Sequence, residues 1–385
     1  MIKNLRCTQI DDELKYQTIM NIPNRKEYLQ QQSQNGQRIM GVLPALYPKE
    51  LLWAFDILPV EIWDPPGDIQ KANAHLQASI CPVVKQSLEF ILKEPEILNA
   101  GYLFPHTCDS LQNLATQVKD LIGVPVPVYT FYNPKGAFNK TTRKYYENIL
   151  ANFKTSLEIR YGELDPLRYL TACELGLKID ARRLELHNAR MKDQLALNNL
   201  EYFQIVRAAE FLKPAEYLDL LRAVDISDQP MGNQQVRVLI SGILPPNNEM
   251  LAALDELDVS IVAEDLLAGS RRIPIVQMDK PESPESYLTD RFFLLPPCST
   301  RGGSLIERLE HLKKLIRASN SQGVIFNIVK FCEPELFDHR MLVKSLKALD
   351  IPVLSLETEL QPGVSGQDKT RVEAFVERLL DEVNV

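Results

Sequence analysis

The chain has 385 residues, of which 45% are hydrophobic and 24% are charged. Such a composition is ordinary for a globular protein, and one domain per about 150 residues predicts two or three domains. The formal net charge of −8 offers no basic surface to a phosphate backbone, so we expect no nucleic acid partner. No apolar run reaches the roughly 20 residues that span a bilayer, and the charged N-terminal segment is not typical of a secretory signal. We therefore expect a cytoplasmic protein with no membrane partner.

A strand, turn, helix, strand pattern occurs twice in the chain, as "RIMGVLPALYPKELLWAFDILPVEIWD" and as "RVLISGILPPNNEMLAALDELDVSIVAED". The two copies keep register at an offset of 201 residues, so that Gly41 corresponds to Gly242 and Asp64 corresponds to Asp265. Apolar strands that flank a helix with apolar spacing predict a βαβ unit. Because strands joined by a helical crossover run parallel, the repeat predicts two similar α/β domains.

Each copy continues to a further apolar strand that ends in a cysteine, Cys108 in "AGYLFPHTCDSL" and Cys332 in "QGVIFNIVKFCEPELFD". A second cysteine precedes each of these, since Cys81 lies 27 residues before Cys108 and Cys298 lies 34 residues before Cys332. Open α/β sheets bind ligands outside the carboxyl ends of their strands. Four thiols in matching places of a duplicated fold are therefore candidates for one site.

The segment between the copies, residues 140 to about 225, carries apolar residues at spacings of three and four, which predicts helices. We expect Pro214 to begin a new helix, because proline fits the first turn of a helix and not its interior. The fold class is predicted to be α/β, with two doubly wound parallel sheets and a helical domain. The predicted domains are an N-terminal α/β domain with Cys81 and Cys108 (residues 1–139), a helical domain (140–230) and a C-terminal α/β domain with Cys332 (231–385).

The six cysteines are spread through a large chain, which argues against a disulfide framework and leaves packing, metal binding or catalysis. Cys173 lies within a helical pattern and is interpreted as a small packing residue, and Cys7 as incidental. For the other four, converging thiolates would suit zinc or an iron–sulfur cluster. No CxxC pair of the kind found in zinc ribbons or ferredoxins is present, so the residues alone leave packing and metal binding open.

Other motifs give less. The common dinucleotide, P-loop and hydrolase signatures are absent from the sequence. The "RGGS" segment from Arg301 to Ser304 is either a phosphate-binding turn or a plain turn before a helix. His106 is either a ligand contact or a structural histidine. Asp109 and Glu333, which directly follow two of the cysteines, are expected to cap helix amides.

Several segments resemble the 2-hydroxyacyl-CoA dehydratase D-component family, which also contains subunits of ATP-dependent benzoyl-CoA reductase. The most specific are "TCDSLQNL", "KFCEPELFD" and "GQDKTRVEAF", and the resemblance runs from about residue 38 to the C-terminus. It implies two flavodoxin-like domains plus a helical one. It also implies a [4Fe-4S] cluster held between the domains by Cys81, Cys108 and Cys332, with Cys298 outside this ligand set though still a candidate near it. It identifies no catalytic residue.

The activity that the resemblance implies is that of a lyase subunit. A separate ATP-dependent iron–sulfur activator would pass one electron to a heterodimer of two homologous subunits and on to an acyl-CoA substrate. A ketyl radical would form, and a 2-hydroxyacyl-CoA would then lose water. The alternatives are ring reduction by a benzoyl-CoA reductase, or a non-redox protein of two domains that binds a small ligand or zinc.

Overall fold

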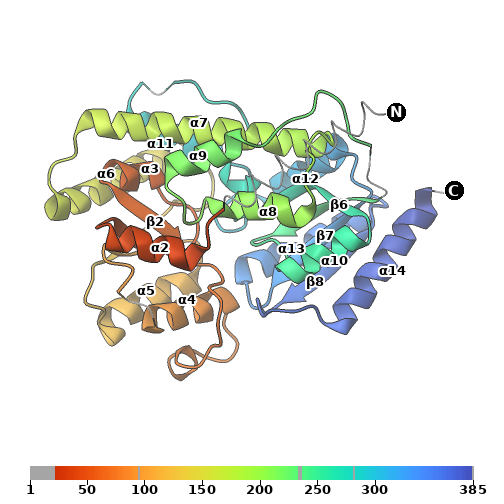
Figure 1. Ribbon diagram of the computed structural model, residues 1–385, viewed down its shortest axis with the longest axis horizontal. Helices are drawn as coiled ribbons and strands as arrows, with labels where there is room; N and C mark the ends of the chain where they lie inside the picture. Colours follow the sequence, from red (N-terminus) through yellow and green to blue (C-terminus); the bar gives the residue numbers. More distant parts are fainter. Residues whose placement is uncertain (1–21, 94–95, 233–235, 281, 384–385) are drawn as a thin grey trace, which may run out of the picture.

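The computed structural model describes residues 22–93, 96–232, 236–280 and 282–383. Two α/β lobes lie side by side, and a layer of helices runs along one side of both (Figure 1). The N-terminal lobe comprises the elements from α2 to β4, the C-terminal lobe those from β5 to α14, and the helical layer those from α6 to α9. Cys7 lies outside the described residues.

The N-terminal lobe contains a four-stranded, all-parallel sheet in the order β2-β1-β3-β4. Its strands are β1 (Arg38–Val42), β2 (Ile57–Glu61), β3 (Gly101–Pro105) and β4 (Val128–Phe131). Its helices are α2 (Arg25–Gln34), α3 (Lys49–Ala54), α4 (Pro82–Lys93) and α5 (Asp109–Thr116), with short turns η1 (Ala72–Ala74) and η2 (Gln117–Ile122). The first two strands and α3 form the predicted βαβ unit.

The C-terminal lobe repeats this plan with a parallel sheet in the order β6-β5-β7-β8. Its strands are β5 (Val236–Gly242), β6 (Val259–Leu266), β7 (Gly323–Val329) and β8 (Val353–Thr358). Its helices are α10 (Asn248–Glu256), α11 (Pro284–Phe293), α12 (Leu305–Ser319), α13 (Glu333–Lys347) and α14 (Gly366–Val383), with the short turn η3 (Ser270–Arg272). In each lobe the crossover after the second strand leads to the opposite side of the first strand, which defines a doubly wound sheet.

Central strands and one edge strand of each sheet are buried on both faces, because helices cover both sides of each sheet. Every residue of β2, β3, β6 and β7 is buried. Gly41 and Gly242 occupy corresponding places in β1 and β5. A Cβ at Gly242 would lie 2.3 Å from the carbonyl oxygen of Asn327, so the close approach of β5 and β7 requires glycine there.

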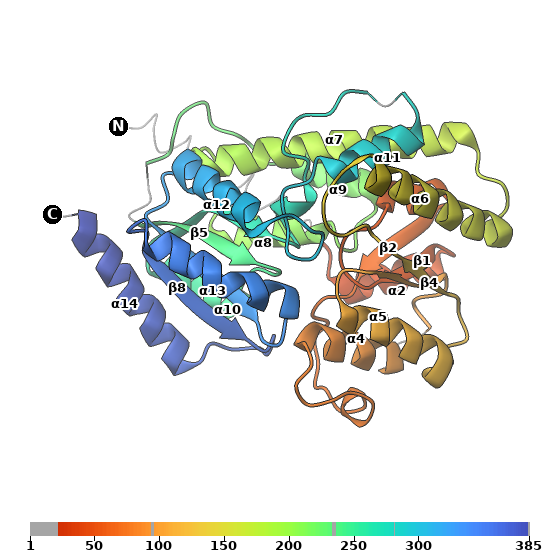
Figure 2. The same ribbon diagram turned by 180° about the vertical axis from the view of Figure 1, so that it is seen from behind.

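The helical layer consists of α6 (Lys140–Tyr161), α7 (Pro166–Met191), α8 (Asn199–Ala208) and α9 (Pro214–Arg222). The side chain of Asn139 caps α6, and Pro214 occupies the first turn of α9, as the sequence predicts. The long helix α7 extends over both lobes (Figure 2). From the C-terminal lobe, α11 packs against α6 and α7, where Phe292 stacks on Tyr146 with ring centroids 4.3 Å apart.

The predicted fold class is confirmed: the structure is α/β with two parallel sheets plus a set of helices. The two βαβ units, the helical middle segment and the helix start at Pro214 all lie where the sequence places them. The domain boundaries themselves stay predictions. Within the described ranges, no helix has both the length and the apolar character needed to cross a bilayer.

Candidate functional site

Cys108 lies in the turn between β3 and α5, where the carboxyl end of a central strand meets a helix. The turn is fixed from two sides. The Thr107 hydroxyl donates to the carbonyl of Pro44 at 3.2 Å, and the Lys135 ammonium donates to the carbonyl of Thr107 at 3.0 Å. Cys108 is the residue that precedes the first turn of α5, and its carbonyl accepts from the backbone of Gln112.

Cys81 and Cys332 occupy the same position at the starts of α4 and α13. Lys85 and Leu336 donate their backbone N–H groups to the carbonyls of Cys81 and Cys332, respectively, which are the first bonds of these helices. The two thiols come from different lobes, and each shifts the pKa of the other, so they lie close together. Both side chains are buried. The structure thus joins the lobes at this pair of cysteines.

The helices α4, α5 and α13 thus each begin after a cysteine, and Cys81 acts on both of the other thiols, so the three N-termini lie near one another. The amides of the first helical turns act on the sulfurs: those of Val83 and Val84 on Cys81, those of Ser110 and Leu111 on Cys108, and that of Glu335 on Cys332. Unpaired N–H groups at a helix N-terminus carry partial positive charge, which favours thiolates and other anions. The arrangement suits a negatively charged group between the lobes.

The prediction that Asp109 and Glu333 cap helix amides is wrong. Asp109 and Glu333 do not cap the helices, because the cysteine before each acid occupies the capping position. The Asp109 side chain is 83% exposed and lies 3.7 Å from Nε2 of His106. Glu333 is exposed. An acid at the first helical position faces solvent once the preceding residue turns its side chain inward, and the sequence alone did not reveal that turn.

The three thiols differ in acidity. The hydrogen bond from Cys332 lowers the pKa of Cys81, and the same contact together with burial raises the pKa of Cys332. Burial raises the pKa of Cys108 to about 11, although the amides of Leu111 and Ser110 and the cation of Lys135 oppose it. The negative charge of Cys81 also raises the pKa of Cys108, which shows that the third thiol lies within electrostatic reach of the pair.

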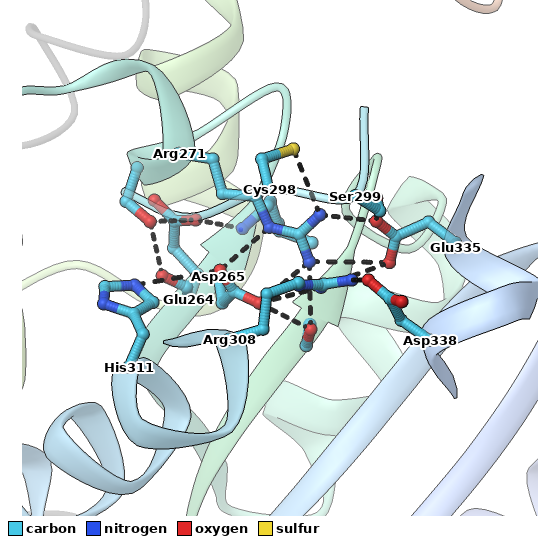
Figure 3. A network of polar contacts seen from close by, with 12 residues as sticks. Glu264, Asp265, Arg271, Cys298, Ser299, Arg308, His311, Glu335 and Asp338 are labelled. Atoms are coloured by element: carbon cyan, nitrogen blue, oxygen red, sulfur yellow. Dashed lines mark hydrogen bonds and ion pairs between the residues drawn. The ribbon is translucent and has the colours of Figure 1, made fainter. Parts of the chain in front are cut away.

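A buried network of charges adjoins Cys332 on the side of the C-terminal lobe (Figure 3). Arg271, which is fully buried, donates to both carboxylate oxygens of Asp265 at 2.8 Å and to Glu335 at 2.6 Å. Arg308 lies 3.7 Å from each of these acids and donates to Asp338 at 2.8 Å. Despite burial, the cations of Arg271 and Arg308 lower the pKa of Glu335 to about 2, and that of Asp265 is lowered by the same two cations. Both carboxylates are therefore ionised at neutral pH.

Cys298 belongs to this network. Its sulfur lies 3.8 Å from a guanidinium nitrogen of Arg271 and 3.1 Å from the hydroxyl of Thr300, and only 1% of the residue is exposed. Its neighbour Ser299 donates to the carboxylate of Glu335. The contacts of Cys298 are thus polar side chains of the C-terminal lobe. Cys173 is fully buried within α7, in agreement with its interpretation as a packing residue.

The phosphate-binding interpretation of the "RGGS" segment is wrong. Arg301 is buried against the rings of Phe138 and Phe292, and its guanidinium donates to backbone carbonyls. Ser304 and Glu307 form a reciprocal cap at the start of α12, which occupies two of the amides of this turn, those of Ser304 and Glu307. The segment is the plain turn before a helix.

His106 lies in the same turn as Cys108, near the side chain of Asp109. Its ring packs on Tyr132 with centroids 5.3 Å apart, and burial and the cation of Lys135 lower its pKa. Among the described residues, no group of three or more Cys, His, Asp or Glu side chains is arranged to chelate a single metal ion. The cysteine ligands of a polynuclear cluster bind different metal atoms, so their sulfurs surround the cluster and do not all approach one point.

The comparisons with known proteins agree with this architecture. Residues 44–379 match the family described as 2-hydroxyglutaryl-CoA dehydratase, D-component. The chain is 25% identical to the (R)-phenyllactyl-CoA dehydratase beta subunit of Clostridium sporogenes, over 93% of this chain and 96% of the relative. It is 26% identical to the beta subunit of (R)-2-hydroxyglutaryl-CoA dehydratase of Acidaminococcus fermentans, over 92% and 96%. It is 22% identical to a benzoyl-CoA reductase subunit of Thauera aromatica, over 84% and 86%.

The chain therefore belongs to the 2-hydroxyglutaryl-CoA dehydratase D-component family, and the family predicted from the sequence is confirmed. The relatives named above are subunits of dehydratases or of a reductase, so the chain is related to enzyme subunits that work with a partner.

The network around Arg271 was missed at the level of sequence. Asp265 appeared only as the repeated acid of the second βαβ unit, and Glu335 only as a letter in "KFCEPELFD". One signal was present: two adjacent arginines, Arg271 and Arg272, follow shortly after a largely apolar strand that ends in two acids. Charges in such a place are buried in pairs more often than alone.

Proposed function

We propose that this chain is the iron–sulfur subunit of an ATP-activated radical 2-hydroxyacyl-CoA dehydratase, and that Cys81, Cys108 and Cys332 hold a [4Fe-4S] cluster between the lobes. The observation that carries the proposal is the meeting of these three cysteines at three helix N-termini. Thiolates are the usual ligands of such clusters, and backbone amides directed at sulfur help to set their potentials. When bound, the cluster supplies transfer of one electron at low potential.

The residues of the chain have separate tasks in this proposal. The three thiolates bind iron and leave one iron without a cysteine. The helix N-termini stabilise the negative charge of the bound group. Cys81 and Cys332 are buried and Cys108 is half-buried, so water is kept from two of the three proposed ligands, which limits side reactions of a reactive electron carrier. Cys298 is not a ligand, since it is held by Arg271 and Thr300.

The proposed partners follow from the relatives. Two of them are named beta subunits of dehydratases, which supports a heterodimer with a homologous second subunit. We further propose that an ATP-dependent iron–sulfur activator delivers the electron and that the substrate is an acyl-CoA whose hydroxyl leaves as water. The protein is proposed to work in the cytoplasm.

Iron and sulfide analysis after anaerobic purification tests the cluster. We expect about four iron and four sulfide per chain, with a broad absorption that bleaches in air. Cys108→Ser should lose the iron, whereas Cys298→Ser should keep it. A colourless wild-type protein that takes up no iron on anaerobic reconstitution would contradict the proposal. Loss of iron from Cys298→Ser as well would replace the ligand set of three by one of four.

The reaction is tested with the partner subunit, the activator, ATP, a reductant and candidate thioesters. Release of an enoyl-CoA from a 2-hydroxyacyl-CoA supports the dehydratase. Reduction of the ring of benzoyl-CoA instead would favour the second candidate, a benzoyl-CoA reductase subunit, which the similarity to the Thauera aromatica protein supports.

A further inference from the structure

The helices α4, α5 and α13, which follow the three cysteines, differ in the character of the third residue after the cysteine. Three residues after its cysteine, α4 carries Val84 and α5 carries Leu111, both buried and apolar. At the same position α13 carries Glu335, which is 2% exposed. An acid at this place in a first turn commonly folds back to cap its own helix. The carboxylate of Glu335 instead points away, into the network around Arg271 (Figure 3).

Glu335 is connected in two directions. Its backbone amide acts on the sulfur of Cys332 and lowers the pKa of that thiol. Its carboxylate accepts hydrogen bonds from Arg271 at 2.6 Å and from Ser299. Arg271 is in turn fixed by both oxygens of Asp265 at the end of β6. A continuous chain of short contacts therefore runs from Asp265 at the end of β6 to the thiol of Cys332.

The network also carries an unbalanced charge. Its two guanidinium groups, Arg271 and Arg308, face three carboxylates, those of Asp265, Glu335 and Asp338. Of the three acids, Glu335 is the one whose charge acts on Cys332. A fixed negative charge in a buried place opposes the addition of an electron nearby.

We propose that Glu335 is a positioning residue for Cys332: Arg271 clamps its carboxylate, the clamp holds the first turn of α13 in place, and the carboxylate keeps the reduction potential of the site low. The part of this inference that concerns the reduction potential rests on the proposed function. The part that concerns the clamp does not. The N-terminal lobe contributes no counterpart, because Val84 and Leu111 cannot be clamped in this way. The lobe that provides one ligand thus controls its position more tightly than the lobe that provides two.

The clamp is tested on the iron-free chain by hydrogen exchange. In Glu335→Ala, exchange of the backbone amides of residues 335–337 should become at least tenfold faster, since the turn loses its anchor. Asp338→Ala is the matched control, because it removes an acid from the same helix and the same network without a link to Cys332. Equal acceleration in both variants, or none in Glu335→Ala, overturns the clamp.

The charge is tested on the reconstituted, iron-loaded chain by redox titration followed by electron paramagnetic resonance. Glu335→Gln should raise the reduction potential by the equivalent of tenfold in the equilibrium, about 59 mV for one electron, while Asp338→Asn should shift it less. An unchanged potential in Glu335→Gln overturns the electrostatic part. If the wild-type chain binds no iron, the proposed function fails together with that part, and the exchange experiment still decides the clamp.

Discussion

The two lobes repeat one fold, but they treat their equivalent acids differently. Asp64 and Asp265 are related by the offset of the repeat, and each forms an ion pair with an arginine. Asp64 pairs with Arg207 of the helical layer, and its side chain is 23% exposed. Asp265 pairs with Arg271 of its own lobe, and its side chain is 1% exposed. The repeat thus determines the position of the acid in the fold, whereas the surrounding residues determine how much its ion pair contributes to stability.

The cysteine-bearing turns show the same contrast. The N-terminal lobe supports Cys81 and Cys108 by backbone amides, by apolar side chains and by the single bonds of Thr107 and Lys135. The C-terminal lobe adds a buried ion network behind Cys332. An ion pair in the interior stabilises little by itself, but the loss of one partner leaves a charge that is costly to keep buried. The C-terminal lobe should therefore be the more sensitive of the two to single substitutions.

The largest difference is expected between Asp265→Asn and Asp64→Asn. The first removes one of the two carboxylates that pair with the buried Arg271 and should lower the free energy of unfolding by about 3 kcal/mol. The second removes a partly exposed pair and should cost about 1 kcal/mol or less. Urea unfolding of both variants measures the difference. Equal costs would show that the repeat, and not the surroundings, sets the energy of the pair.

A smaller difference is expected at the paired glycines. A Cβ at Gly242 would meet the backbone oxygen of Asn327, which is fixed in the ladder between β5 and β7. A Cβ at Gly41 would meet side chains alone, the ends of Leu98 and Ile62 at 2.7 and 3.0 Å and the ring of Tyr102 at 3.0 Å, and side chains yield more readily than backbone. We expect Gly242→Ala to cost about 3 kcal/mol and Gly41→Ala about 1 kcal/mol. A thermal melt that ranks them in the opposite order contradicts the packing argument.

The smallest effect is a pH dependence confined to the C-terminal lobe. Burial raises the pKa of Glu264 to about 7, and the corresponding residue of the N-terminal lobe is Trp63, which does not titrate. In the unfolded chain Glu264 loses its proton near pH 4.3, but in the folded chain it keeps the proton until about pH 7. Stability from this group is therefore lost as the pH rises toward 7, by about 1 kcal/mol over the last pH unit, and the loss levels off above pH 7.

Glu264→Gln removes this loss, because glutamine cannot ionise. Urea unfolding at pH 6, 7 and 8 should show a smaller decline for the variant than for the wild-type chain, with most of the difference between pH 6 and 7. His187 lies 3.8 Å from Glu264, and burial lowers its pKa to about 4, so it stays neutral in the folded chain across this range. Its contribution is therefore the same in both proteins. Identical declines would show that Glu264 is ionised in the folded chain at pH 6.

The sequence predicted the fold well because its signals are local. Apolar runs, the glycine and proline turns and the offset of 201 residues placed both βαβ units, and Pro214 placed the start of α9. The thiols were singled out because each strand-end cysteine recurs in both lobes. Contacts across the lobes, such as that between Cys81 and Cys332, depend on how two separate sheets dock, and no spacing within one segment encodes that.

The polar interior was harder to predict for a related reason. Glu335 and Asp109 both stand in the first turn after a cysteine, yet one is buried against Arg271 and the other faces solvent. Asp109 is the first residue after its cysteine and Glu335 the third, but the third residue after Cys81 and after Cys108 is apolar, so the repeat does not predict a buried acid there. The difference arises from Asp265 and Arg271, which are more than 60 residues away from Glu335 in the chain.

The placement of the three cysteines on both lobes has a thermodynamic consequence. A group that binds Cys81, Cys108 and Cys332 together can bind only when the lobes are docked, so its occupancy adds to the stability of the whole chain by mass action. At a hundred times its dissociation constant such a group would add about 2.7 kcal/mol. Loss of the group would loosen the junction and raise the fraction of chain that proteases can cut. The lifetime of the protein in a cell would then depend on how often this group is lost.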